Sequence, residues 1–451
     1  MILIQKKIGR CFVITMPISK NSYKKIILLP VEISSRELLS KVLLANQFAS
    51  NNCVVFLGDK QSILEISRYT KNSIYFDKGY HKNVSEGIYK TLKQNSIKII
   101  SLDEENAVDF KDFQQLDLRF PDNILQEFEL IFLWGKKQYE FLKKNRDNFN
   151  LENIFVSGHP RFDLLKDNLN SVYKREANRI KSEFGKFILV NTNFGLGNNL
   201  KGNEFIIKNY GSRFPQIKKL IEYQSMQVNN FIRLCQEISY FKDFNIILRP
   251  HPEENLELYK ENLAAKENVF VLKEGSVIPW IMSSEVMIHH DCTTSIESAM
   301  LGKNSIAYTK DINRDLTTDI PLRISYDFDS IDKINDYIKN ISIVSKKINQ
   351  DILEEYFNFN SSSTSKIIGE TLKIDSKDPK IKKYNSYKIK RFIKDLVKKI
   401  LKKEDPLYEK KMEGLNLKNL ITIKRKYDTI FSTNTKIIEV HKRLFKITNE
   451  S

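Results

Sequence analysis

The sequence is poor in the residues and runs that mark several common kinds of protein. It contains four cysteines, at positions 11, 53, 235 and 292, with no CxxC spacing. This scatter argues against a zinc site or a disulfide framework and suits a reducing cytoplasm. No apolar run approaches the roughly 20 residues that a bilayer span requires. The apolar run at residues 11–18 is too short for a signal peptide and contains Pro17.

Glycine-rich phosphate-binding motifs are also missing. Neither GxGxxG nor GxxxxGK occurs in the chain, so neither common nucleotide-binding loop is indicated. In the second half, no Asp-x-Asp pair follows an expected strand. We therefore expect a site that works without a metal or another cofactor.

Acidic charge is scarce at the carboxyl end. The chain carries 73 Lys+Arg against 56 Asp+Glu, for a net charge of +17. Residues 376–451 alone carry 22 against 9, so the preceding 375 residues contribute only +4. A body so close to neutral argues against a general nucleic-acid-binding surface, and we expect no nucleic-acid partner.

What the sequence does contain is alternation of strands and helices. In the first part, apolar runs predict strands at 25–31, 53–57, 97–102, 130–134 and 154–156, with helices at 36–50 and 136–144. In the second part, strands are expected at 187–193, 246–248, 269–272, 286–288 and 305–308, with a long helix near 218–239. This order predicts an α/β chain with two Rossmann-like domains, 1–165 and 166–375, that face a cleft.

Residues 376–451 differ from both expected domains. Between 387 and 403, apolar residues recur at i, i+3, i+4 and i+7, and eight Lys and Arg fill the remaining positions. This pattern predicts a basic amphipathic helix in a helical tail. We expect the tail to bind an anionic membrane surface. The alternative is that the apolar stripe packs against the two domains.

Two polar clusters follow expected strands of the second domain. Arg249, His251 and Pro252 follow the strand at 246–248, and the stretch Thr293-Thr294-Ser295 follows the strand at 286–288. Ligands of open α/β sheets bind beyond the carboxyl ends of the strands. The two clusters could therefore hold one phosphate, the second through hydroxyls and a helix start. The alternative is a proline turn and an ordinary helix cap.

Other candidates are weaker. Glu297 could accept hydrogen bonds from a ribose or base, or be a first-turn helix glutamate. Asp103, Glu104 and Glu105 follow the strand at 97–102 and could supply a general base, or form a solvated acidic loop. Asn193 and Gly195 lie in a loop that could approach a ligand. His159, at the domain junction, is expected to act as a cap or hinge.

Together these motifs resemble the bacterial surface carbohydrate biosynthesis proteins, over about residues 20–330. The likeness includes Asp-Lys-Gly at 77–79, Gly-His-Pro-Arg-Phe-Asp at 158–163, Arg-Pro-His-Pro at 249–252 and Cys-Thr-Thr-Ser-Ile-Glu at 292–297. The resemblance implies a GT-B fold. It also implies a relation to sialyltransferases and Kdo transferases, which use CMP-activated sugars. Their acidic motif matches at Glu104-Glu105, although Asn106 replaces a glycine, and their His-Pro motif matches at His251-Pro252.

The resemblance implies a glycosyltransferase that moves an acidic sugar of the sialic acid or Kdo kind from a CMP donor. Asp103, Glu104 or Glu105 would be the base, and His251 would stabilise the leaving phosphate. The acceptor would be a surface glycan of the capsule or lipopolysaccharide kind, free or lipid-linked, at the inner face of the cytoplasmic membrane. Alternatives are a CDP-glycerol-type polyol-phosphate transferase, a non-catalytic assembly protein that binds nucleotide sugars, and a sugar 2-epimerase.

Overall fold

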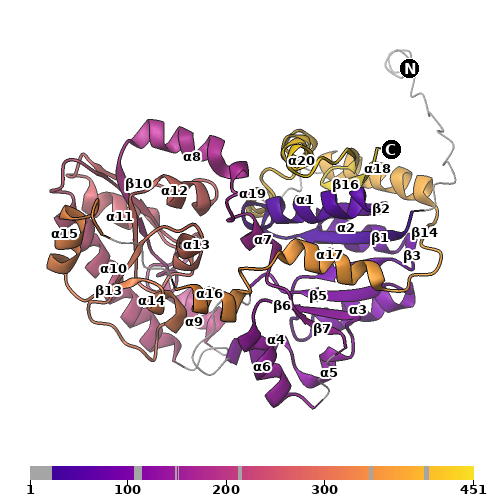
Figure 1. The fold of residues 1–451 in the computed structure, drawn as a ribbon, viewed down its shortest axis with the longest axis horizontal. Helices are drawn as coiled ribbons and strands as arrows, with labels where there is room; N and C mark the ends of the chain where they lie inside the picture. Colours follow the sequence, from indigo (N-terminus) through magenta and orange to yellow (C-terminus); the bar gives the residue numbers. More distant parts are fainter. Residues whose placement is uncertain are drawn as a thin grey trace, which may run out of the picture.

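The computed structural model of the chain describes residues 23–105, 114–147, 150, 152–211, 216–344, 349–400 and 406–450. They form two α/β domains that lie side by side along the long axis of the molecule (Figure 1). Each domain is built on a sheet of mostly parallel strands, and one cavity is lined by both domains. The predicted α/β fold, with two Rossmann-like domains facing a cleft in the GT-B manner, is confirmed.

The first domain contains a sheet of eight strands in the order β15-β16-β2-β1-β4-β5-β6-β7. The six strands from β2 to β7 in this order are parallel to one another. Every residue of β1 is buried, because helices cover both faces of the sheet, and such strands read as continuous apolar runs. The parallel strands are β1 (Lys25–Val31), β2 (Cys53–Asp59), β4 (Ile74–Asp77), β5 (Lys98–Leu102), β6 (Leu130–Leu133) and β7 (Ile154–Val156).

The turn from β1 into helix α1 is fixed by a buried carboxylate. Glu37 accepts hydrogen bonds from the backbone N–H groups of Glu32 (3.0 Å) and Ile33 (3.3 Å). Unpaired donors at a helix start are thereby satisfied, and the first turn of α1 is held at the carboxyl edge of the sheet. The helices of this part are α1 (Ser34–Ser50), α2 (Lys60–Ser67), α3 (Ser85–Gln94), α4 (Gln114–Arg119), α5 (Asp122–Leu125), α6 (Lys136–Asn145) and α7 (Pro160–Asp163).

The second domain has six parallel strands in the order β10-β9-β8-β11-β12-β13. This is the doubly wound order in which the chain direction reverses beside the first strand, and ligands bind at that switch point. Its strands are β8 (Phe187–Asn191), β9 (Asn245–Arg249), β10 (Val269–Val271), β11 (Val286–His289), β12 (Ser305–Tyr308) and β13 (Tyr326–Phe328).

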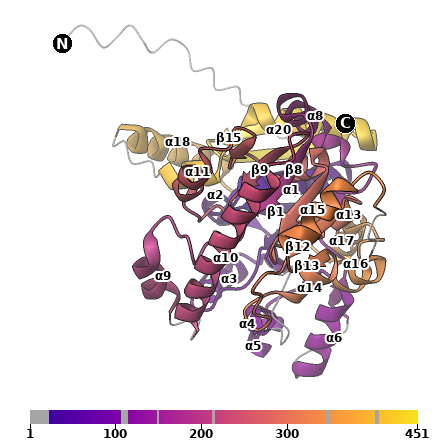
Figure 2. The same cartoon turned by 90° about the vertical axis from the view of Figure 1, so that its left-hand side faces the viewer.

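Helices surround this second sheet, as the view onto that end of the molecule shows (Figure 2). The long helix α10 has an apolar face that packs on the sheet through Val228, Phe231 and Leu234. The helices are α8 (Ser171–Phe184), α9 (Gly202–Tyr210), α10 (Ile217–Ile238), α11 (Leu256–Leu263), α12 (Val277–Ser283), α13 (Thr294–Met300), α14 (Asp319–Arg323) and α15 (Ile331–Lys339).

After α15 the chain returns to the first domain, earlier than the expected boundary at residue 375. Helix α16 (Gln350–Phe357) contacts α6, and α17 (Ser363–Lys373) contacts α1 and α7. The carboxylate of Asp163 accepts hydrogen bonds from the N–H groups of Ser363 (3.1 Å) and Thr364 (2.7 Å), at the start of α17. Residues 350–373 therefore belong to the packing of the first domain.

The structure also differs from the expectation that residues 376–451 form a helical tail outside the domains. The segment contains α19 (Pro406–Lys411), α20 (Leu417–Phe431) and a hairpin of β15 (Thr435–His441) and β16 (Leu444–Asn449). Strand β16 pairs antiparallel with β2, and the Tyr427 hydroxyl of α20 donates to the Leu39 carbonyl of α1 at 3.0 Å. The hairpin covers a sheet edge that would otherwise offer unpaired backbone groups.

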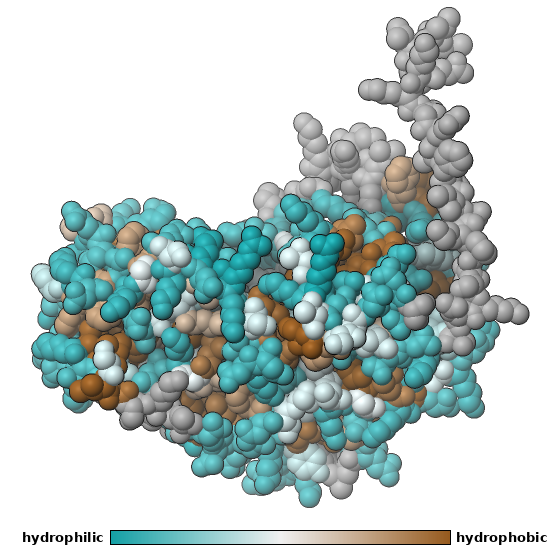
Figure 3. Space-filling view, turned by 45° about the horizontal axis from the view of Figure 1, so that its top comes forward, coloured by the Kyte–Doolittle hydropathy of each residue, from teal (hydrophilic) through white to brown (hydrophobic). Residues whose placement is uncertain are grey.

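Helix α18 (Tyr384–Ile400) contains most of the predicted amphipathic helix. Tyr387 and Arg391 face the body of the protein, whereas Ile389, Phe392 and Ile393 are 61%, 70% and 55% exposed. In the space-filling view, apolar surface is visible at the right-hand end, the end that carries α18 in Figure 1 (Figure 3). Residues 401–403, and the side chains of residues 395–400, lie outside what the structure describes. A short antiparallel pair, β3 (Thr70–Lys71) with β14 (Lys380–Ile381), precedes the helix.

Among the described residues, no helix has the length and apolar character that crossing a membrane would need. The largest apolar core joins the two domains. It contains Leu38 and Phe162 of the first domain together with Tyr173, Ile278 and Ile296 of the second. This shared packing lies beside the cavity, so it holds the facing walls in place.

Candidate active site

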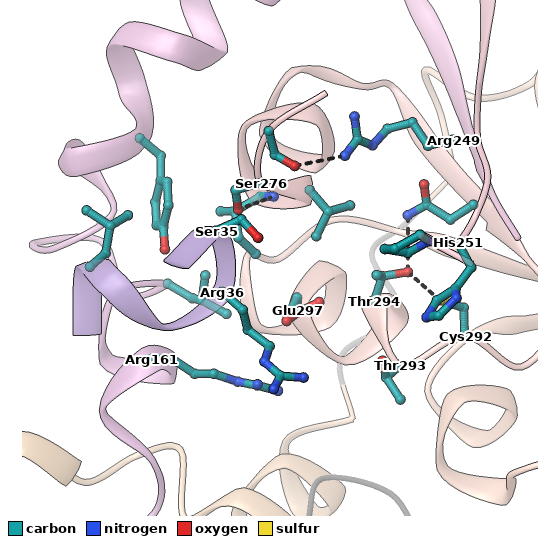
Figure 4. Close-up of a pocket in the computed structure, with 18 of the residues that line it drawn as sticks. Ser35, Arg36, Arg161, Arg249, His251, Ser276, Cys292, Thr293, Thr294 and Glu297 are labelled. Carbon is teal, nitrogen blue, oxygen red and sulfur yellow. Dashed lines mark hydrogen bonds between the residues drawn. The ribbon is translucent and has the colours of Figure 1, made fainter. Parts of the chain in front are cut away.

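The carboxyl edges of both sheets open onto one cavity of about 460 Å³ (Figure 4). The segments after β9 and β11, which the sequence placed at neighbouring strand ends, both line it. Of the predicted site residues, the lining includes Glu104, Glu105, Arg249, His251, Pro252, Thr293, Thr294 and Glu297. Asp103, Asn193, Gly195 and Ser295 are not among the residues that line it.

His251 reaches the cavity from the loop after β9. Its Nδ1 accepts a hydrogen bond from the Glu253 N–H at 3.4 Å, so the proton of a neutral ring lies on Nε2. Desolvation by the surrounding walls lowers the pKa of His251. The ring is therefore neutral at pH 7. A Cβ on Gly195 would lie 3.2 Å from Nδ1, so the glycine leaves room for the His251 ring.

A buried carboxylate that sequence reasoning missed holds this loop. Glu254 is fully buried and accepts hydrogen bonds from the N–H groups of His251 (2.9 Å) and Phe194 (3.0 Å). It also accepts from the hydroxyls of Thr192 (2.8 Å) and Tyr259 (2.5 Å). Burial raises the pKa of Glu254, against the lowering effect of these bonds. The carboxylate thus ties the loops after β8 and β9 together.

Arg249 is partly occupied by its own domain. Its guanidinium donates to the carbonyls of Glu274 (2.6 Å) and Gly275 (3.2 Å) and lies 5.1 Å from the ring centre of Trp280. Burial lowers the pKa of Arg249 to about 10, so the group remains charged at pH 7. Arg249 therefore holds the loop after β10 and contributes positive charge to the cavity wall.

The segment after β11 presents hydroxyls to the cavity, and two of its backbone N–H groups are already occupied. The N–H groups of Ser295 and Ile296 already donate to Cys292 and Thr293 carbonyls at 3.1 and 3.0 Å. The Ser295 hydroxyl is buried and donates to the Cys292 carbonyl (2.9 Å), so Ser295 has a structural role here. Thr293 is exposed, and the Thr294 hydroxyl accepts from the Asn191 amide at 3.1 Å. A phosphate at this wall would contact Thr293 and Thr294.

Asn193 and Glu297 are placed differently from each other. The Asn193 amide donates to Asp291 at 2.6 Å, which fixes the loop after β8 against the loop after β11. Glu297 lines the cavity, and burial raises the pKa of its carboxyl, whereas Arg161 and Arg36 act to lower it. Glu297 therefore faces two cations of the opposite domain.

The acidic loop after β5 contains one carboxylate that is locked in place. Glu104 is fully buried and contacts Lys41 Nζ at 2.7 Å and His159 Nε2 at 3.3 Å. Burial alone would raise the pKa of Glu104, but Lys41 and then His159 outweigh it and hold the pKa well below its usual range. The His159 side chain also accepts from Arg161 N–H at the start of α7, which confirms the expected capping role.

The neighbouring carboxylates differ in access. Asp103 is buried, its carboxylate lies 3.3 Å from Arg119 Nε, and burial raises its pKa to about 6. Glu105 has a half-exposed side chain that bridges Arg36 and Arg119, each at 3.0 Å. Burial acts to raise the pKa of Glu105, but the two arginines lower it overall. Glu105 is therefore ionised at neutral pH and accessible from the cavity.

Two arginines of the first domain line the cavity although sequence reasoning did not select them. Arg36 lies in the first turn of α1, and Arg161 lies in α7. Arg161 lies within a motif that carries the resemblance, although the resemblance assigned it no role. Arg36 follows the end of an expected strand, and this position could have indicated a place in the site. Their guanidinium groups lie next to each other and point into the cavity (Figure 4).

Metal ligation finds no support in the part of the chain that the structure describes. There, no group of three or more His, Cys, Asp or Glu side chains is arranged to hold a metal ion.

No protein-family model matches the chain, and no curated protein matches it in sequence. Solved structures with a related arrangement include the UDP-GlcNAc 2-epimerase of Methanocaldococcus jannaschii, at 11% identity and a TM-score of 0.49 over 77% of this chain and 98% of that one. The UDP-GlcNAc 2-epimerase of Neisseria meningitidis is 12% identical, with a TM-score of 0.47 over 77% of this chain and 98% of that one. The wall teichoic acid polymerase TagF is 12% identical, with a TM-score of 0.44 over 77% of this chain and 87% of that one. At these values the similarity says nothing of this protein's substrate.

Proposed function

We propose that the protein is a glycosyltransferase that moves an acidic sugar of the sialic acid or Kdo kind from a CMP-activated donor to a bacterial surface glycan. The observation that carries this proposal is the single cavity onto which both sheets open. One of its walls offers an imidazole, two threonine hydroxyls and an arginine, and the other offers an ionised carboxylate. The resemblance in the sequence supports the cytidine donor.

The second domain would hold the donor. The Nε2–H of neutral His251 and the hydroxyls of Thr293 and Thr294 would donate to the donor phosphate, and Arg249 would add positive charge. Such groups are fixed before the reaction, so they stabilise the charge that develops on the leaving phosphate without reorganising. Glu297 would accept hydrogen bonds from hydroxyls of the sugar or ribose.

The first domain would bind and activate the acceptor. Glu105 would take the proton of the acceptor hydroxyl, whose oxygen then bonds to the anomeric carbon of the sugar. The bond from that carbon to the phosphate oxygen breaks, and its electron pair leaves with CMP. We assign the base to Glu105 because Glu104 is held in a buried ion pair and Asp103 does not reach the cavity.

The acceptor would be presented at a membrane surface. Helix α18 exposes Ile389, Phe392 and Ile393, and the segment from residue 376 onward carries a net charge of +13. Apolar residues at the headgroup boundary and lysines near anionic lipid both favour binding. We therefore place the protein at the inner face of the cytoplasmic membrane, next to a lipid-linked glycan.

CMP release tests the proposal. Purified full-length protein is incubated with CMP-N-acetylneuraminic acid, CMP-Kdo or CDP-glycerol, with and without a glycan acceptor. Release from an acidic CMP-sugar, lowered about 100-fold or more by His251→Ala, supports it. His441→Ala, on β15, is the matched control and should retain the rate. Release from CDP-glycerol alone would favour a polyol-phosphate transferase, and no release from any donor would overturn the assignment.

A further inference from the structure

The two arginines of the first domain have no part in the phosphate site described above. The guanidinium of Arg161 lies 4.9 Å from the ring centres of both Trp134 and Phe162. Its Nη1 donates to the Glu104 carbonyl at 3.4 Å, and its Nε is buried without a hydrogen-bond partner. The aromatic rings and this backbone contact therefore hold Arg161 in one orientation, with donor capacity left over.

The charges around these arginines are not balanced inside the cavity. Glu104 is paired with Lys41, and Glu105 bridges Arg36 and Arg119. Of the cations that line the cavity, Arg161 and Arg249 then remain, with Glu297 as the carboxylate that is not already paired. Between described residues, no ion pair joins Glu297 to Arg36 or Arg161.

An unpaired buried cation is costly, and an anion that enters would remove that cost. Burial lowers the pKa of Arg161, and Glu297 is the first of the charges that oppose this effect. The cavity is therefore prepared for a negatively charged group at the first-domain wall.

This wall is distinct from the phosphate wall. Figure 4 shows Arg36 and Arg161 on the opposite side of the cavity from His251, Thr294 and Arg249, and Glu297 lies between the two groups. A ligand that spans the cavity would meet both positive regions.

We propose that Arg36 and Arg161 form a second anion subsite, which binds the carboxylate of the sugar that is transferred. The inference rests on the proposed function, because it concerns the donor held in the same cavity. Guanidinium groups match the planar geometry of a carboxylate and can bind it through two parallel hydrogen bonds. The subsite would select acidic sugars over neutral ones.

The test compares two ligands that differ in one charge. Dissociation constants are measured by calorimetry for CMP, CMP-N-acetylneuraminic acid and the methyl ester of its carboxylate. Wild type should bind the acid about 10- to 100-fold more tightly than the ester, the range expected for a hydrogen bond to a charged group. Arg161→Gln should remove this preference and leave CMP affinity within about threefold.

Arg36→Gln is a second variant, because Arg161 packs on aromatic rings and its loss could disturb the fold. It should also remove the preference. Arg179→Gln is the matched control. Arg179 lies on the surface of α8, where it pairs with Glu176 and Glu183, and its variant should keep the preference.

The outcomes separate the two proposals. Equal binding of acid and ester by wild type would overturn the subsite, and so would equal losses for CMP and the acid in both variants. The donor site would then remain, since CMP still binds. If CMP itself fails to bind to folded wild-type protein, the proposed donor class falls and the subsite falls with it.

Discussion

Ending the chain at Asp375 should prevent the first domain from folding, because the removed segment is part of its core. The truncation deletes five apolar side chains that are no more than 1% exposed, namely Leu420, Tyr427, Leu444, Phe445 and Ile447. At about 1.5–3 kcal/mol each, they contribute about 7–15 kcal/mol. The whole stability of a domain is about 5–15 kcal/mol, so their loss is enough to unfold it.

Strand β2 would also lose its neighbour on one side, β16. Residues Val55 to Gly58 pair with β16, so the truncated sheet would offer an unpaired edge to other chains. Thermal unfolding and size-exclusion chromatography should therefore show an aggregated protein with no cooperative transition.

Point variants give a graded version of the same test. Phe445→Ala should cost about 3–5 kcal/mol in the free energy of unfolding. Ile438→Ala, on the neighbouring strand with a 43% exposed side chain, should stay within about 0.5 kcal/mol of wild type. Denaturant unfolding measures both. A truncated protein that melts cooperatively at the wild-type temperature, or equal effects of the two variants, would refute the structural role of the hairpin.

The remaining predictions concern charges and the exposed helix. Glu104→Gln should destabilise the fold by about 3–5 kcal/mol, because it leaves Lys41 buried and unpaired; Glu105→Gln should keep the melting temperature and lower turnover about 100-fold or more, and the opposite pattern would exchange their roles. The pKa of Asp103 is raised from 3.8 to about 6, so the stability that its protonated carboxyl contributes is present below pH 4 and lost as the pH rises through 6. The free energy of unfolding of wild type should therefore fall by up to about 3 kcal/mol relative to that of Asp103→Asn between pH 4 and 7. A constant difference between the two proteins would contradict the shift. Replacing Phe392 on α18 by Ser should weaken flotation of the full-length protein with anionic vesicles at low salt, while Tyr240→Ser, an equally exposed aromatic on the second domain, should not.

Much of the fold follows from local patterns in the sequence. Buried parallel strands such as β9 and β11 read as short apolar runs, because helices cover both of their faces. Polar residues after such runs mark the carboxyl edge of the sheet, which is why Arg249, His251 and Thr294 could be placed at one site before the structure was known. Strand β4 (Ile74–Asp77), although equal in length to β11, was not among the predicted strands.

What could not be predicted depends on partners distant in sequence. The roles of Glu104 and Glu105 differ only because Lys41 and His159 close around the first, whereas the second remains half exposed. Glu254 becomes the anchor of two loops only once β8 and β9 are adjacent. Contacts of this kind leave no periodic pattern in the sequence.

The C-terminal hairpin was missed for a related reason. Its strands carry the exposed Lys436 and the half-buried Lys446, so the basic composition of the segment concealed the apolar residues that pair against β2.

Nucleotide binding by the cavity tests the central claim most directly. The melting temperature of the full-length protein is measured with equal concentrations of CMP, CDP, UDP and GDP, for wild type and for His251→Ala. A ligand that binds the native state raises the melting temperature by mass action. The account predicts that CMP or CDP stabilises wild type more than UDP or GDP does, and that His251→Ala loses most of this shift. Greater stabilisation by UDP or GDP, or an undiminished CMP shift in His251→Ala, would contradict it.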